Sequence, residues 1–199
     1  MAVTERPSAR ETKRLQTRER LMGAAIAEFA RAGMAEADVG AIVGAAGVAH
    51  GTFFFHFPTK EHVLLELERR EEERIAKQFA QFLKSKHDLA AALDEAVRLV
   101  VGLERRLGDV LFNDFLALHF SQTRPPTEGG RDHPLIVLVA QEISLAQERG
   151  ETDPDVNAMN SAVFFLLGLY ALLITTNHWP TGRDLLDDYV ARTLRSMRP

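Results

Sequence analysis

The sequence predicts an all-α protein of about nine helices, and three observations support this fold class. Apolar residues recur with the 3.6-residue period of a helix, whereas no segment shows the sustained alternation that is typical of a strand. Glycine, proline and capping residues separate the periodic segments. The composition, 46% apolar and 26% charged over 199 residues, can supply a buried core. Because cysteine is absent, disulfide scaffolds, thiolate zinc sites and cysteine nucleophiles are excluded.

Three helices are expected in the first sixty residues. The first covers residues 17–32 and stops at Gly33, where a glycine can adopt the left-handed conformation at low cost. The second covers residues 39–45 and follows Asp38, whose side chain can cap it. The third, over residues 49–56, follows a short turn.

A fourth and longer helix is expected from Thr59 to about Ser85. Its ends are apolar, but its middle, ELERREEERIAK, is charged on all sides. A helix with this pattern is expected to be solvated in the middle and to bridge two bodies. The chain is therefore expected to consist of a flexible basic arm (1–13), an N-terminal domain (14–74) and a C-terminal domain (75–199).

The C-terminal domain is expected to hold the remaining helices. They cover, in order, residues 88–107, 110–120, 134–150, 153–178 and 183–197, with a loop at 123–132. Asp153 is expected to cap the helix that follows it, with Pro154 at the first helical position. The run from Ala162 to Ile174 has no charge, but it is too short for a ~30 Å hydrocarbon core. We therefore expect a buried helix and no membrane partner.

The charge is distributed unevenly along the chain. The net charge is −4 overall, but it is +2 over residues 1–60 and −6 over residues 61–199. Six cations in the first twenty residues face only three glutamates. This asymmetry indicates a polyanionic partner at the N-terminal end, although a solvated basic tail would fit the charge equally well.

The most informative segment is ADVGAIVGAAGVAHGTFFFHF, residues 37–57. Two short helices separated by a turn with Gly47 are typical of a helix-turn-helix, whose second helix enters the major groove of DNA. The spacing alone would also fit a plain helical hairpin. However, AAGVAHGTFFFHFPTKEHVL resembles the DNA-binding domain of the TetR/AcrR family of transcriptional regulators, and the resemblance is close from Thr17 to Leu64.

The resemblance implies which residues contact double-stranded DNA. The expected DNA-binding positions are Arg18, His50, Gly51, Thr52, Phe54 and Lys60. Among them, His50 is expected to read a base, Thr52 to contact a phosphate or a thymine methyl group, and Lys60 to contact a phosphate. For His56 the expected role is packing.

The segment departs from the family pattern at Asp38, Gly40, Ala49 and Phe54. Asp38 still caps its helix but places a carboxylate near DNA phosphates. Ala49 replaces the usual serine cap, and Phe54 replaces a tyrosine that typically donates to phosphate. Whether these four substitutions weaken DNA binding is left open by the sequence.

The resemblance also implies that the C-terminal domain binds a small effector and forms a homodimer. The expected effector is largely apolar, because the candidate lining offers one imidazole and no obvious buried charge pair. The expected pocket residues are Phe79, Phe82, Val97, Phe112, Leu116, His119, Val139 and Phe165. The expected dimer-interface residues, on the last two helices, are Leu167, Gly168, Ala171, Leu172, Thr175, Leu185, Tyr189 and Leu194. For any one ring, ordinary core packing is the alternative.

The expected function is that of a ligand-responsive repressor that binds a palindromic operator as a dimer and is released by its effector. An enzyme is not expected, because HExxH, GxSxG, GxGxxG and Walker A patterns are all absent. No cofactor and no metal are expected. A DNA-binding architectural protein without an effector is the other alternative, although it would not need an acidic second domain. The polar N-terminus has no signal sequence, so a cytoplasmic location is expected. The effector, the operator and the target genes cannot be derived from the sequence.

Overall fold

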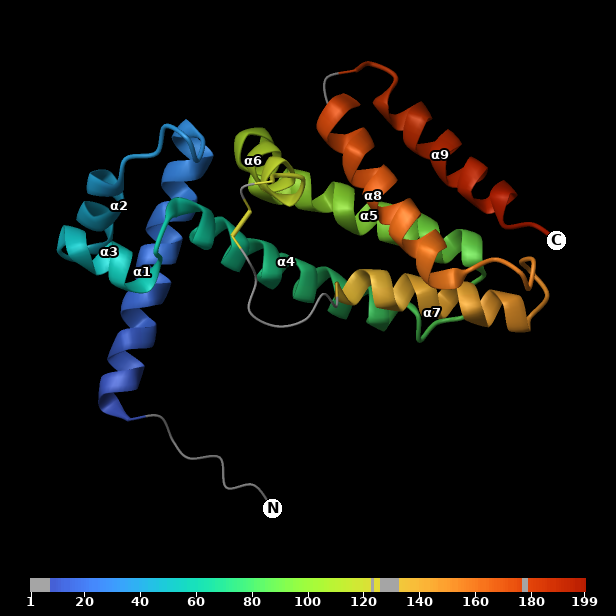
Figure 1. Cartoon of the computed structure of the whole chain (residues 1–199), viewed down its shortest axis with the longest axis horizontal. Coiled ribbons are helices and arrows are strands. Elements are labelled where there is room, and N and C mark those ends of the chain that lie inside the picture. Colours follow the sequence, from blue (N-terminus) through green and yellow to red (C-terminus); the bar gives the residue numbers. More distant parts are fainter. Residues whose placement is uncertain (1–7, 123, 126–132, 177–178) are drawn as a thin grey trace. The chain divides into compact units, whose positions relative to one another are not determined.

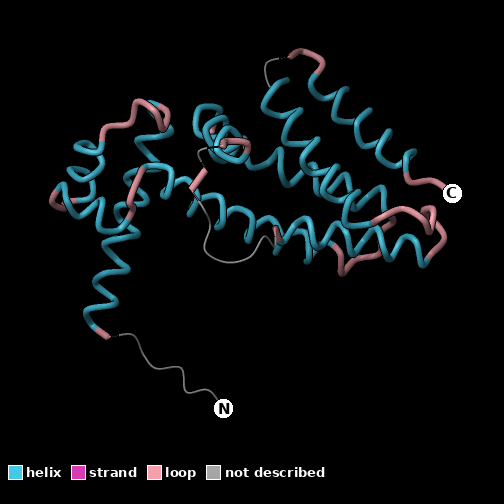
Figure 2. Tube along the Cα trace, in the orientation of Figure 1, coloured by secondary structure: helices cyan, strands magenta, loops and turns pink. Residues whose placement is uncertain are grey.

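The structure is a computed structural model that describes residues 8–122, 124–125, 133–176 and 179–199 (Figures 1 and 2). All regular elements in these residues are helices, so the all-α prediction is confirmed. The described helices are α1 Ala9–Ala32, α2 Val39–Ala46, α3 His50–His56, α4 Lys60–Phe82, α5 Leu89–Leu107, α6 Asp109–His119, α7 Pro134–Glu148, α8 Ala158–Thr176 and α9 Gly182–Ser196.

The chain divides into two compact units. Unit 1 consists of Met1–Leu67 and Leu107–Pro125, and unit 2 consists of Glu68–Arg106 and Pro126–Pro199. Helix α4 begins in unit 1 and continues into unit 2, so the boundary falls within the long helix, as it does in the sequence-based division. Helix α6, which the sequence placed in the C-terminal domain, groups with unit 1.

In unit 1, helix α1 begins earlier than the sequence predicted. Ser8 and Glu11 form a capping box, in which the Glu11 backbone N–H donates to the Ser8 hydroxyl and the Ser8 N–H donates to the Glu11 carboxylate. Hydrogen bonding to Ser8, through its backbone and then its side chain, lowers the pKa of Glu11. Residues 9–13, which were expected in a flexible arm, are therefore helical. The rest of that arm, residues 1–7, lies outside the described residues.

The core of unit 1 is formed where α1, α2, α3 and the start of α4 meet. Its fully buried side chains include Leu21, Phe29, Ile42, Phe53, Phe57 and Leu64. Helix α6 packs on α1, and the Asp114 carboxylate on α6 accepts a hydrogen bond from the Met34 backbone N–H at 2.5 Å. Gly33, beside Asp114, has φ 79° and ψ 154°. This is a positive-φ conformation that favours glycine, but it is not the left-handed helical region that we expected.

In unit 2, the middle of α4 is not the solvated segment that the sequence predicted. Glu68 and Glu71 are buried, as are Ile75 and Ala76 in the next turn. The Glu71 carboxylate pairs with Arg74 on α4 and with Arg106 on α5. The expectation was wrong because Arg106, 35 positions away in the sequence, offsets the desolvation cost of burying the Glu71 carboxylate.

Helices α7 and α8 pack against each other in unit 2. Helix α8 begins at Ala158 rather than at Asp153, because the Asp153 carboxylate accepts from Asp155 N–H in a turn while Asn157 accepts from Asn160 N–H. By length and composition alone, α8 could cross a membrane, as many core helices could. Its buried side chains, such as Phe165 and Leu169, are those of a core helix.

Candidate nucleic-acid interface

Helices α2 and α3 of unit 1 form the predicted helix-turn-helix. Their axes are bent by 95° at the break between them, within the range typical of this motif. Gly47 begins the turn with φ 65° and ψ 42°, in the left-handed region that a glycine adopts without strain. Phe53 on α3 is fully buried, which fixes the face that α3 turns toward the core.

The cap of α2 explains two of the departures from the family pattern. The Asp38 carboxylate accepts hydrogen bonds from the backbone N–H groups of Gly40 at 2.8 Å and Ala41 at 3.2 Å. A Cβ atom at position 40 would lie 3.2 Å from the Asp38 carboxylate oxygens, so a side chain there would crowd the cap. The predicted cap is confirmed. Helix α3, by contrast, has no side-chain cap at Ala49.

The outer face of α3 carries four of the six expected DNA-binding residues. His50, Gly51 and Phe54 are exposed, and Thr52 is half-buried. Phe55, whose side chain is 73% exposed, lies on the same helix and was not among the expected DNA-binding residues. The signal was present in the sequence, because only one of three consecutive phenylalanines in a helix can face the core squarely.

Arg18, one of the expected DNA-binding residues, makes its contacts within unit 1. Its guanidinium donates to the His56 carbonyl at 2.6 Å and lies 4.1 Å from the centre of the Phe57 ring. A nitrogen of the same group is 3.7 Å from the Glu66 carboxylate. Arg18 therefore joins α1 to the end of α3 and the start of α4, which makes it a positioning residue for the recognition helix.

Lys60 also makes hydrogen bonds within unit 1, to the segment that precedes α2. Its ammonium group donates to the carbonyls of Ala35 at 2.7 Å and Ala37 at 3.2 Å, in the connection between α1 and α2. The side chain thus ties the start of α4 to the segment that precedes α2. A phosphate contact by Lys60 remains a prediction.

The first half of α1 carries exposed cations in addition to Arg18. Arg10, Lys13, Arg14 and Arg20 are exposed on the first half of α1. Burial, followed by the charges of Arg18 and Arg14, lowers the pKa of His56. The positive field of this half of α1 therefore reaches the C-terminal end of α3.

The expected effector-pocket residues are divided between the units. Phe79, Val139 and Phe165 are buried in unit 2, where Phe82 and Val97 are half-buried. Phe112, Leu116 and His119 belong to α6 and hence to unit 1. The pocket remains a prediction.

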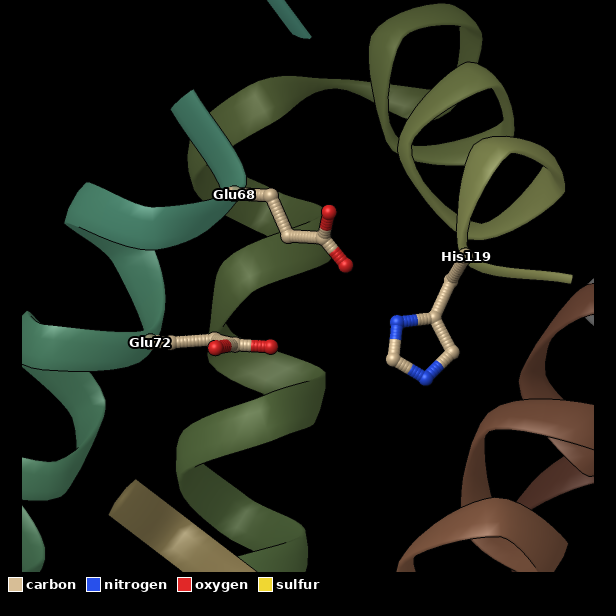
Figure 3. Close-up of side chains that lie close together, drawn as sticks. All are labelled: Glu68, Glu72 and His119. Carbon is tan, nitrogen blue, oxygen red and sulfur yellow. The ribbon is translucent and has the colours of Figure 1, made fainter. Parts of the chain in front are cut away.

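Unit 2 contains buried polar groups that the sequence analysis did not foresee. Glu68 and Glu72 lie one turn apart on α4 (Figure 3, which also draws His119 of α6). Burial, and then the charges of Glu72 and Glu68, raises the pKa of the Tyr170 hydroxyl. An oxygen of the Glu72 carboxylate lies 3.0 Å from Nδ1 of His133, within hydrogen-bonding distance. The interior of unit 2 is therefore more polar than the sequence predicted.

The expected dimer-interface residues differ in exposure. Leu167, Ala171 and Thr175 are exposed on α8, whereas Leu172 is half-buried.

Gly168 is explained by packing within the chain, because a Cβ atom at this position would overlap the Tyr189 side chain. The Tyr189 hydroxyl donates to the Phe165 carbonyl at 2.7 Å, and its ring stacks on that of Phe165. Leu185 and Leu194 on α9 are half-buried. Phe164, which we had not predicted, is 71% exposed on the same side of α8 as Leu167.

Comparison with known proteins places these features among bacterial regulators. Residues 21–67 match the family described as "Bacterial regulatory proteins, tetR family". The HTH-type transcriptional regulator UidR of Escherichia coli strain K12 is 26% identical over 166 residues, which are 82% of this chain and 83% of UidR.

Two solved structures share the fold at lower identity. RolR in complex with resorcinol matches with a TM-score of 0.72 at 20% identity, over 94% of this chain and 90% of RolR. FadR of Thermus thermophilus, described as a TetR-family transcriptional repressor in complex with lauroyl-CoA, matches with a TM-score of 0.68 at 23% identity, over 89% of this chain and 91% of FadR. UidR and FadR are thus both described as transcriptional regulators.

Proposed function

We propose that the chain is a transcriptional regulator of the TetR family, a repressor that binds a palindromic operator as a homodimer and is released by a small effector. The observation that carries this proposal is the helix-turn-helix of unit 1. Its outer helix face is exposed, and Arg18 and Lys60 hold its two ends in place. The DNA on which a bacterial regulator acts is in the cytoplasm, so we place the protein there.

A homodimer follows from the proposed operator. Two recognition helices related by a two-fold axis are needed to read a palindrome whose half-sites lie about 34 Å apart. The exposed face of α8 supports the proposal, since Phe164, Leu167 and Ala171 follow one another at helical spacing and present apolar surface. Large exposed apolar side chains that form a contiguous patch are typical of a protein interface.

The effector is proposed to be a small molecule with a largely apolar body. Resorcinol in RolR and lauroyl-CoA in FadR support this class, since both carry an apolar part. The buried rings of Phe79 and Phe165 in unit 2 can pack against such a molecule.

Release from DNA is proposed to act through α4, because this helix runs from Lys60 in unit 1 to Phe82 in unit 2. An effector that favours one position of α4 would change the spacing of the two recognition helices. A coupling of about 1–3 kcal/mol would change DNA affinity by about 5- to 150-fold.

Selection of binding sites from random DNA tests the proposal for the operator. The purified protein should enrich a palindrome, whereas failure to enrich any sequence would overturn the proposed function. For the effector, resorcinol and lauroyl-CoA are the first probes, each titrated with and without the selected operator. A true effector must bind more weakly in the presence of operator, by the same factor by which it weakens DNA binding. Equal affinity in both titrations would exclude that compound as a releasing ligand.

A further inference from the structure

We infer that Phe55, together with Phe54, determines operator specificity by reading the 5-methyl groups of thymines in the major groove. The inference rests on the proposed function, because it assigns the chemistry by which α3 would distinguish bases. It concerns one residue that the sequence analysis included among the DNA contacts and one that it missed.

Both rings are exposed to solvent. Phe55 is 73% exposed and Phe54 is 47% exposed, whereas the preceding Phe53 is fully buried. A phenylalanine side chain carries 150–250 Å² of surface, so an exposed ring on a seven-residue helix leaves a large apolar area in water. Contact with an apolar group of a binding partner would remove this area from water, which lowers the free energy of the complex.

Helix α3 lacks most of the side chains that read bases by hydrogen bonding. Its sequence, HGTFFFH, contains no arginine, lysine, asparagine, glutamine, aspartate or glutamate. These are the side chains that form the bidentate or charge-assisted contacts to guanine, adenine and cytosine in the major groove. The remaining distinctive group of the groove is the thymine methyl, which is recognised by apolar contact. Besides His50 and Thr52, whose polar atoms can hydrogen-bond to DNA, the side chains that α3 offers to the groove are the two exposed rings, and these match the thymine methyl group.

Each of the two rings contacts neighbouring rings of α3 before any DNA is bound. The centre of the Phe54 ring lies 5.3 Å from the centre of the buried Phe53 ring, which it meets edge-on, and 5.6 Å from the centre of the His50 ring. The Phe55 ring meets the His56 ring edge-on at 5.1 Å. Side chains that are already ordered lose less entropy when they bind. Because residues 54 and 55 are consecutive, they point about 100° apart around the helix and can reach different base pairs.

Positive charge lies near the C-terminal end of the helix that carries the rings. Arg14 acts on His56 at the end of α3, and Arg10 and Lys13 are exposed on the same helix as Arg14. Cations in this place attract the phosphates on either side of a groove, and they carry no sequence information themselves. The apolar face and its basic flank together fit duplex DNA better than they fit a second copy of an acidic protein.

The experiment replaces thymine by uracil, one position at a time, in the operator recovered by selection. Uracil lacks only the 5-methyl group, so base pairing and the other groove atoms are unchanged. Loss of one buried methyl contact should weaken binding about fourfold, and the symmetric pair of substitutions should weaken it about 15-fold. We expect this effect at one or two thymines in each half-site, measured by fluorescence anisotropy with the full-length wild-type protein.

The same titrations with Phe55→Ala assign the effect to the ring. This variant should bind the thymine operator more weakly and should no longer distinguish uracil from thymine at the position that Phe55 reads. Phe120→Ala is the matched control, since Phe120 is 45% exposed in unit 1 but follows α6 rather than lying on α3. It should keep the full response to uracil. Circular dichroism should show equal helix content in all three proteins.

Two results separate the inference from the proposed function. If the wild-type protein binds its selected operator tightly and tolerates uracil at every position, the inference is overturned and the proposed function stands. The inference is also overturned if Phe55→Ala keeps the wild-type response to uracil at every position. If the wild-type protein selects no operator at all, both are overturned.

Discussion

Replacing Arg18 with alanine should destabilise the DNA-binding unit rather than remove a phosphate contact. The wild-type side chain donates a charged hydrogen bond to the His56 carbonyl at 2.6 Å, and its guanidinium lies 4.1 Å from the Phe57 ring centre. The nearby Glu66 carboxylate, 3.7 Å away, adds a weaker, partly exposed ion pair. These three interactions are lost together in the variant.

The size of the effect follows from their ordinary magnitudes. A hydrogen bond from a charged donor contributes about 1.5–3 kcal/mol. The cation–π contact contributes about 0.5–2 kcal/mol and the ion pair less than about 1 kcal/mol. Because one side chain makes all three, their effects do not add fully, and we expect a loss of about 2–3 kcal/mol in the free energy of unfolding. For a chain of this length, this lowers Tm by roughly 5–10 °C.

Two measurements distinguish this positioning role from a phosphate contact. Thermal unfolding followed by circular dichroism should show the lower Tm for Arg18→Ala, while Arg20→Ala, an exposed neighbour on the same helix, should stay close to the wild type. The salt dependence of operator binding should keep its slope. An unchanged Tm together with a slope reduced by about 0.9 per protomer would refute the reasoning and make Arg18 a phosphate ligand.

Substitutions at three further residues test other parts of the structure. His87 donates to the Glu142 carboxylate at 2.9 Å and to the Ser85 carbonyl, and chiefly the bond to Glu142 raises the pKa of His87 above 6.5. Glu142→Gln should therefore lower Tm most below about pH 6.5, where His87 is charged in the folded and the unfolded chain. The difference in Tm between the variant and the wild type should shrink as pH rises through the raised pKa of His87. A difference in Tm that does not depend on pH would contradict the charged pair. Asp114→Ala leaves the Met34 N–H without its acceptor, so chemical denaturation should show a free energy of unfolding that is lower by about 1–3 kcal/mol. Asp114→Asn should recover part of this loss. Equal stability of the wild type and both variants would contradict this role of Asp114. Leu167→Asp should yield species of 22.2 kDa by light scattering, and an unchanged dimer would exclude this face of α8.

The parts of the molecule that depend on neighbouring residues in the sequence were predictable. The cap at Asp38 and the turn at Gly47 need only a side chain and a backbone two or three positions apart, and both are present in the structure. The helical class followed from apolar periodicity for the same reason. The α8 start was misplaced because Asp153 caps a turn and Asn157 caps the helix, and both are good capping residues.

The parts that depend on distant residues were not predictable. Arg18 and His56 are 38 positions apart, so nothing local indicated that the arginine is used inside unit 1. The burial of Glu71 depends likewise on Arg106 of α5. The assignment of α6 to unit 1 depends on its packing against α1, which no periodicity within either helix can indicate.

The central claim, that this chain reads a specific DNA sequence, is tested most directly by the ratio of two affinities. The dissociation constant is measured for the selected operator and for a shuffled duplex of the same composition, both at about 150 mM salt, since affinities depend steeply on salt. The account predicts a preference of about 1,000-fold or more for the operator, with two protomers bound to each duplex. Equal affinity for the two duplexes would contradict it.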